Sequence, residues 1–249
     1  MSNMPDVLWL NTSPSLKCFE RPVLNVLSKH YSTYRWDYEQ TPDEASCLEI
    51  ALVLLHDYLK QGDRSVHLVG HGTAGVLGLL YARRYPERVK SLSLLSVGAH
   101  PAIDWHAHYY AQRQLLPCSR ELILAQMARM LFGSQNQVMT RCLVQRLADD
   151  LDQSLSLHTL FKRTSLEPGG APVPVLVCAG EHDAVVNPNE FYHWQHWLKH
   201  GDSLWQCPNG RHFFHYAHPD LLAEQLLQFW SRLNSTVVRA GYPAFRLEA

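Results

Sequence analysis

The chain has 249 residues, of which 46% are hydrophobic and 18% charged, and this balance predicts a folded globular protein rather than a disordered one. Lys and Arg number 22 against 23 Asp and Glu, giving a net charge of −1. That balance argues against nucleic acid or an anionic membrane as the main partner, because both attract proteins with a surplus of Lys and Arg.

Signals for targeting are missing from the sequence. The first residues, Met1 to Asp6, contain no basic segment followed by an apolar one, so we expect no secretory signal. No run of about 18 apolar residues occurs, so we expect no membrane span. The 6 cysteines are scattered without a Cys-x-x-Cys pair, which indicates ordinary thiols in a reduced compartment. We therefore expect a cytoplasmic protein.

Short apolar runs alternate with helical patterns over residues 1–99, as is typical of a parallel sheet with crossover helices. The apolar pattern predicts strands at 7–10, 33–37, 66–69 and 89–95. Helices are expected at 21–29, from 42 to about 60, and at 75–85. Pro42, Asp43 and Glu44 are expected to open the second of these helices, since acidic residues favour the start of a helix.

The pattern changes at about residue 100, and residues 100–168 show helical spacing without a convincing strand. One helical face is expected to carry Leu122, Ile123, Met127, Met130 and Leu131. After Pro168-Gly169-Gly170, we expect a strand at 173–178, a helix at 189–199, a short strand at 203–206 and a helix at 219–233. Residues 235–249 have no clear period and are expected to pack on the surface or to reach a partner.

These elements predict an α/β fold with a mostly parallel sheet of about six strands flanked by helices. Residues 1–99 and 169–249 are expected to form this core. Residues 100–168 are expected to form a helical cap, because a helical insertion between two strands of one sheet covers that sheet rather than folding apart from it.

The segment from Val66 to Gly75 reads Val-His-Leu-Val-Gly-His-Gly-Thr-Ala-Gly and leads into a helix rich in Ala and Leu. Small residues at a tight strand-to-helix turn let the chain reverse without Cβ clashes. In a nucleophile elbow this turn reads Gly-x-Ser-x-Gly. The preceding Leu-Val-Gly-His sets the register, so Gly72 stands at the serine position.

With this turn, the chain resembles the α/β-hydrolase superfamily with a helical cap. The resemblance extends over Tyr81–Val89, Leu176–Asp183 and Asn209–Phe213. It implies the α/β-hydrolase fold, with Asp183 as the catalytic acid and His212 as the base, in the family's order.

The resemblance also implies an oxyanion hole from the backbone N–H groups of Ser13 and Thr73, with Asn11 and His71 beside it. The loop after the first strand departs from the family. It reads Asn11-Thr12-Ser13-Pro14, where the family usually has His-Gly.

Gly72 has no side chain, so it cannot form the covalent ester of acyl transfer. Our leading hypothesis is a member that lost serine-ester turnover and binds a small apolar ligand or a protein partner. The alternative is a hydrolase or lyase that uses the Asp183–His212 dyad on water or on a substrate proton, or a substitute nucleophile. Candidate substitutes are Thr73, Thr12, Ser13 and Ser15. A third possibility is a scaffold that docks a protein through the cap, the segment 193–200 or the C-terminal residues.

The chain is rich in histidine, with 15 residues, but we expect neither a metal site nor a cofactor. His212, His215 and His218 cluster, as do His106 and His108, yet no His-Glu-x-x-His motif or carboxylate triad accompanies them.

Two aromatic groups have open roles in the sequence. A predicted helical face carries His193, His196 and His200 beside Trp194 and Trp197, either for packing on the sheet or as an interface patch. In the cap, four aromatic residues either line an apolar pocket or belong to the core: Trp105, Tyr109, Tyr110 and Phe132.

Overall fold

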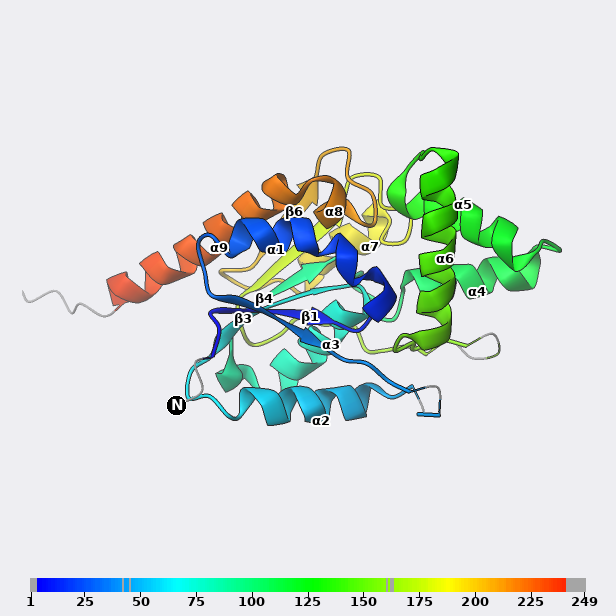
Figure 1. The fold of residues 1–249 in the computed structure, drawn as a ribbon. Helices are drawn as coiled ribbons and strands as arrows, with labels where there is room; N and C mark the ends of the chain where they lie inside the picture. The colour runs from blue at the N-terminus through cyan, green and yellow to red at the C-terminus, as the bar shows by residue number, and fades with distance from the viewer. Residues whose placement is uncertain (1–3, 42, 45, 160, 162–163, 241–249) are drawn as a thin grey trace, which may run out of the picture.

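The computed structural model describes residues 4–41, 43–44, 46–159, 161 and 164–240. At its centre lies a six-stranded sheet of order β2-β1-β3-β4-β5-β6, in which all neighbouring strands are parallel (Figure 1). The strands are β1 (Val7–Asn11), β2 (Thr33–Asp37), β3 (Val66–His71), β4 (Val89–Leu95), β5 (Val175–Gly180) and β6 (Ser203–Cys207). The predicted sheet is therefore confirmed.

Helices cover both faces of the sheet, with α1 and α9 on one side and α2 and α3 on the other (Figure 1). Along β1, Val7 and Trp9 pack toward α1 and α9, whereas Leu8 and Leu10 pack toward α2 and α3. Successive side chains of a strand point to opposite faces, so a strand covered on both sides reads as a continuous apolar run. The four helices are α1 (Arg21–Leu27), α2 (Leu48–Leu59), α3 (Thr73–Arg84) and α9 (Pro219–Ala240).

Three helices form the insert between β4 and β5, and they lie beyond one end of the sheet (Figure 1). They are α4 (Trp105–Leu115), α5 (Arg120–Phe132) and α6 (Gln137–Gln153). Each begins with a polar side chain that accepts a hydrogen bond from the first helical turn: Asp104 from Ala107 N, Ser119 from Leu122 N and Asn136 from Met139 N. Such caps satisfy backbone N–H groups that have no partner within the helix.

The cap is joined to the core by a buried polar cluster around Asp150 of α6. This carboxylate is 0% exposed and accepts hydrogen bonds from Ser154 and, at 3.1 Å, from Ser15. His106 of α4 lies 3.0 Å from its other oxygen. Because a buried carboxylate without partners is costly, these contacts hold α4, α6 and the loop after β1 in one arrangement.

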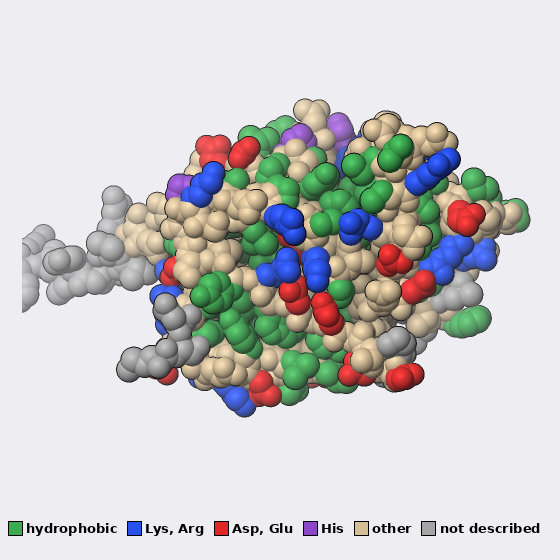
Figure 2. All heavy atoms as spheres, viewed as in Figure 1, with side chains coloured by type: hydrophobic (Ala, Val, Ile, Leu, Met, Phe, Trp, Pro, Cys, Tyr) green, Lys and Arg blue, Asp and Glu red, His purple; other side chains and the backbone are tan. Residues whose placement is uncertain are grey.

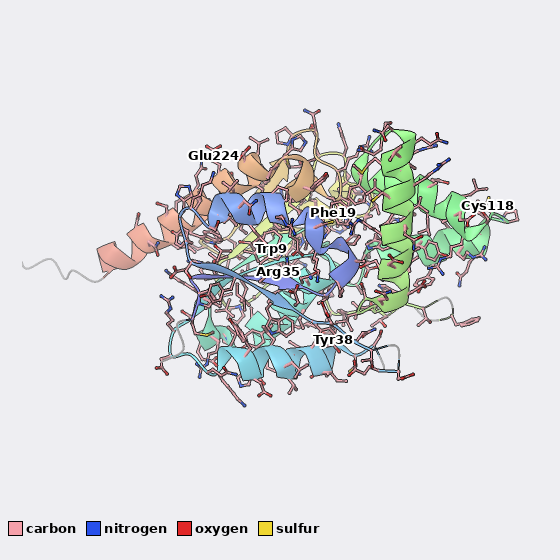
Figure 3. All side chains as sticks on the ribbon, viewed as in Figure 1. Trp9, Phe19, Arg35, Tyr38, Cys118 and Glu224 are labelled. Atoms are coloured by element: carbon pink, nitrogen blue, oxygen red, sulfur yellow. The ribbon has the colours of Figure 1, made fainter. Side chains whose placement is uncertain are left out.

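An aromatic cluster packs at the same boundary between the cap and the core. Phe19, labelled in Figure 3, has its ring centroid 4.9 Å from that of Phe132 in the cap and 5.7 Å from that of Phe213 in the core. Phe132 stacks on Phe213 at 4.3 Å. Aromatic pairs at such distances add to the free energy of burial. Phe132 therefore belongs to the packing between cap and core.

The short elements are the helices α7 (Pro188–Tyr192) and α8 (Phe214–Ala217) and the 3-10 helices η1 (Pro14–Phe19), η2 (Pro86–Arg88) and η3 (His193–His196). The predicted helix at 189–199 is therefore wrong as a continuous element, because α7 tightens into η3 and ends. Trp194 is buried and donates its Nε1–H to Val97 O at 2.9 Å, whereas Trp197 is 44% exposed. His193, His196 and His200 are exposed but do not share one α-helical face.

Two further boundaries differ from the sequence prediction. Helix α2 begins at Leu48 rather than near residue 42, and Glu44 lies in a separate turn, where its N–H donates to Thr41 O at 3.0 Å and its carboxylate accepts from Thr41 N. Residues 42 and 45 lie outside the described residues. On α5, Ile123, Met127 and Leu131 are buried as predicted, but Leu122 is 64% exposed. Helix α9 runs to Ala240, past the predicted end, and residues 241–249 lie outside the described part of the chain.

On the face that Figure 2 shows, basic and acidic side chains lie beside one another near the middle of the molecule. Arg35, labelled in Figure 3, pairs there with Asp37 at 2.7 Å. Across the described chain, no helix has both the length and the apolar composition that crossing a membrane requires.

Candidate functional site

The turn between β3 and α3 is built by three glycines. A Cβ at Gly70 would lie 2.7 Å from the backbone of Ala74, and one at Gly75 would lie 2.7 Å from Gly70 O. The strand end and the first turn of α3 therefore touch backbone to backbone. Gly72, between them, has φ 52° and ψ −126°, and its N–H donates to Leu95 O at 3.0 Å. No atom lies within 4 Å of the place where its Cβ would stand.

Asp183 and His212 come together at the ends of the loops after β5 and β6. The Nδ1 of His212 lies 3.1 and 3.2 Å from the two carboxylate oxygens of Asp183, and both side chains are buried. Asp183 also accepts the backbone N–H groups of Val185 and Val186. Burial raises the pKa of Asp183, but the neighbouring His212 and these hydrogen bonds outweigh it and hold the pKa below its ordinary value.

The second ring nitrogen of His212 is available to accept a proton. Its Nε2 is buried and has no hydrogen-bond partner among the described residues. The Asp183 carboxylate holds the hydrogen on Nδ1, which leaves Nε2 as an acceptor when the ring is neutral. The arrangement can therefore take a proton from a group placed beside Nε2.

Two further residues fix the backbone of His212. The hydroxyl of Ser96 donates to His212 O at 2.9 Å, and His71 Nε2 lies 3.0 Å from the same oxygen. Ser96 has φ 50°, a left-handed conformation that costs a residue with a Cβ about 1–3 kcal/mol. Burial, together with His215 and His212, lowers the pKa of His71 well below its ordinary value. His71 is therefore a neutral donor that positions the base.

One of the two predicted oxyanion donors, the backbone N–H of Ser13, already has a partner, and a carboxylate lies beside the other residue, Thr73. Ser13 N–H donates to Asn11 Oδ1 at 2.9 Å, and Asn11 Nδ2 in turn donates to Asp37 at 2.6 Å. The Thr73 hydroxyl donates to Asp104 Oδ2 at 3.2 Å. Asp104 is 4% exposed, so a carboxylate stands beside the start of α3. Negative charge there opposes the development of an oxyanion.

A cavity of about 30 Å³ joins these groups, and all the predicted site residues except Asp183 line it. Residues that no sequence motif marks also line this cavity. Its lining is Asn11, Thr12, Ser13, Leu16, Glu20, His71, Gly72, Thr73, Ala74, Asp104, Trp105, His106, His212, Phe213 and His215.

Asp104 and Glu20 are titratable residues of this cavity that the sequence did not mark, and His215 was marked only as a member of a histidine cluster. Asp104 is detectable only as a helix N-cap before Trp105. Burial raises the pKa of Glu20 to about 8, although Trp9 and Arg35 act against it. Burial and the nearby His212 lower the pKa of His215 to about 3. No sequence pattern marks Glu20, because burial alone makes it unusual.

A second cavity of about 390 Å³ lies within the insert, between α4 and the segments that precede α4 and follow α6. Its lining is largely apolar with three histidines: His100, Ala102, Ile103, Ala107, His108, Ala111, His158, Thr164, Ser165 and Leu166. Burial and the nearby His212 lower the pKa of His108. This histidine of the cavity therefore lies near enough to the dyad to interact with it electrostatically.

Of the four cap aromatics, Trp105 alone lines the cavity at Gly72. Tyr109 is buried in the core, and Tyr110 borders a separate hollow beside α6. Of the four candidate substitute nucleophiles, Thr12, Ser13 and Thr73 line the same cavity as His212, but none of them makes a hydrogen bond with its Nε2. Ser15 donates to Asp150 and the Thr73 hydroxyl to Asp104.

Comparison with known proteins gives the family. The model of the alpha/beta hydrolase family matches residues 12–225. "Uncharacterized protein sll0249" of Synechocystis sp. is 47% identical over 235 residues, covering 93% of this chain and 94% of its own length. "Uncharacterized protein alr2406" of Nostoc sp. is 43% identical over 242 residues, covering 97% of each.

A solved structure shares the fold. Naproxen esterase from Bacillus subtilis superposes with a TM-score of 0.67 at 19% identity, over 92% of this chain and 85% of its own. The family model matches most of the chain, and the structure has a parallel sheet with a helical insert. The chain therefore belongs to the alpha/beta hydrolase family.

Proposed function

We propose that this family member does not form an acyl-enzyme and instead binds a small, largely apolar molecule in a cavity within its helical cap. One observation carries the proposal. Gly72 occupies the turn between β3 and α3, in one cavity with His212, and offers no oxygen or sulfur for attack on an acyl carbon.

The surroundings of Gly72 support the loss of acyl transfer. An oxyanion needs free N–H donors, but Ser13 N–H is already bonded to Asn11. Asp104 adds a buried carboxylate near Thr73. Because a like charge disfavours a developing anion, restoring a nucleophile alone is not expected to restore the full rate of a serine esterase.

The cavity of about 390 Å³ is the best candidate for the ligand. Its volume falls within the range of about 300–1,000 Å³ that is usual for small-molecule sites, and such sites are mostly apolar with a few polar groups. Ala107, Ile103 and Leu166 supply apolar wall, and His108 and His158 supply polar groups. The cavity at Gly72, at about 30 Å³, is too small for an organic ligand.

Binding of the neutral dye N-phenyl-1-naphthylamine tests this site. The wild-type chain should bind one dye molecule with a rise in fluorescence. Ala107→Phe, which fills the cavity, should weaken binding at least tenfold. Leu122→Phe, on the exposed face of α5, is the matched control and should bind like wild type. Equal binding by the Ala107→Phe protein would refute this cavity as the ligand site.

A second candidate function rests on the unpartnered Nε2 of His212. The cavity of about 30 Å³ beside it can hold one or two water molecules, since a water needs only about 10–15 Å³ measured in this way. With Asp183 orienting the ring, His212 is placed to act as a general base on such a water or on a small protic substrate. This candidate predicts turnover that depends on the His212 imidazole and disappears in His212→Ala.

Labelling with a fluorophosphonate distinguishes the candidates. Wild type should give no adduct and no turnover of a short acyl ester. Labelling of the wild-type protein would contradict both candidate functions and would indicate that another side chain acts as the nucleophile. Unlabelled wild type whose ester turnover disappears in His212→Ala would favour the general base over the binding protein.

A further inference from the structure

We propose that His100, Glu190 and His193 form a binding site for a divalent transition-metal ion of the zinc class. The site lies where the loop after β4 meets α7 and η3, away from the dyad. It shares His100 with the lining of the cavity of about 390 Å³ but involves neither the Asp183–His212 pair nor the turn at Gly72, and Zn²⁺ binding without the dye tests it apart from the function proposed above.

The three side chains already converge. One ligand atom from each, an imidazole nitrogen or a carboxylate oxygen, lies within 4.8 Å of the other two. The Nδ1 of His100 is 2.9 and 3.1 Å from the two oxygens of Glu190. Ligand atoms bound to one tetrahedral zinc at about 2.0–2.1 Å are separated by about 3.3–3.4 Å. The first pair is within about 0.5 Å of this spacing, and a complete site also needs the His193 ligand atom, which lies within 4.8 Å of both, to draw in.

The backbone around these residues is fixed although His100 and Glu190 are 90 positions apart. Ala99 N donates to Glu190 O at 3.2 Å, and His100 N lies 3.3 Å from Glu190 Oε2. Next to His193, the buried Trp194 donates to Val97 O at 2.9 Å. The loop and α7 are thus held together beside each ligand, which lowers the ordering cost of binding.

The donor set selects the class of ion. Two imidazoles and one carboxylate bind zinc in several hydrolases and ferrous iron in oxygenases, whereas Mg²⁺ and Ca²⁺ prefer oxygen ligands. Within the described residues, the ion-pair partner of Glu190 is His100, so no Lys or Arg competes with a cation there. His100 and His193 are exposed, which leaves the site open to solvent ions.

Zinc titration of the full, tag-free chain tests the site. After metal is removed with a chelator, Zn²⁺ is added at pH 7.5 in competition with a chromophoric indicator. One equivalent should bind. The variants His100→Gln, Glu190→Gln and His193→Gln should each weaken binding at least tenfold, and excess Mg²⁺ should not compete. His30→Gln, an exposed histidine in the turn after α1, is the control and should leave the affinity unchanged.

Two outcomes overturn the proposal: no stoichiometric binding by wild type, or binding that the three variants retain, which would place the ion on other histidines. Co²⁺ gives an independent readout, since its visible absorption reports nitrogen and oxygen ligation and should disappear with the same substitutions. Unchanged circular dichroism of the metal-free variants excludes misfolding. Affinity should also fall in acid, because protonated imidazole cannot bind a metal.

Discussion

Two glycines in the turn before α3 are required for different physical reasons. Gly72 is surrounded by open space but has φ 52°, so a side chain there fits sterically and strains the backbone. Gly70 has the opposite problem, because its Cβ would meet the backbone of Ala74 at 2.7 Å. Backbone atoms packed at a helix start cannot move aside as a flexible side chain can.

This difference gives a prediction on stability. Gly72→Ala should lower the free energy of unfolding by about 1–3 kcal/mol, the usual cost of a strained backbone conformation. Gly70→Ala should lower the free energy of unfolding by at least as much. Its Cβ would clash with the backbone at the start of α3, and overpacking of this kind costs about 1–3 kcal/mol. Urea denaturation measures both. Gly201→Ala, at φ 92° with open space in a distant turn, is the control for strain alone. A larger loss at Gly72 than at Gly70 would contradict this account.

At the level of elements, the pair His106–Asp150 connects α4 and α6. Burial by itself lowers the pKa of His106, but the hydrogen bond and charge of Asp150 more than offset it and raise the pKa above its ordinary value. A group with a raised pKa in the folded state stabilises fully below its unfolded pKa of about 6.5 and loses that contribution as pH rises through the folded value.

His106→Gln should therefore destabilise the protein most near pH 6 and less at pH 9. Removing one partner of a buried pair costs about 3–5 kcal/mol, and the glutamine amide recovers part of this as a hydrogen bond. Denaturant unfolding at both pH values measures the difference from wild type. The exposed His30→Gln should show no such difference. A cost independent of pH would mean that His106 is neutral in the folded protein.

For the whole molecule, two buried histidines set the response to acid. Burial lowers the pKa of His67 to about 3, and burial with the nearby His212 lowers that of His215 to about 3. Between about pH 6.5 and 3 the unfolded chain binds protons at these sites that the folded chain does not. Stability therefore falls as pH falls, by about 1.4 kcal/mol per pH unit for each histidine.

The substitution His215→Phe should remove the proton that the unfolded chain takes up at this position. The imidazole lies among aromatic rings, with Trp9 at 6.0 Å and Phe213 at 5.6 Å, so a phenyl ring is the closest apolar replacement. The slope of unfolding free energy against pH between 4 and 6 should decrease by about 1.4 kcal/mol per pH unit. An unchanged slope would show that His215 is protonated in the folded state.

The sheet was predictable because a strand covered on both faces has a local signature. Val7–Leu10 is a continuous apolar run and Val66–Val69 is apolar apart from the buried His67, and both are strands. Helix limits were less predictable where capping and turn contacts decide them. Glu44 makes a turn instead of starting α2, and the segment 189–199 tightens to a 3-10 helix because Trp194 is anchored on Val97.

The sequence by itself determined the fold, the glycine at position 72 and the expectation that Asp183 and His212 form a pair. Each depends on local spacing or on motifs in a fixed order. Only the tertiary structure decided that Asp104 and Glu20 face the same cavity, and that Glu190 meets His100. Such contacts depend on how distant segments pack, and burial rather than residue type sets their charge, so no local pattern records them.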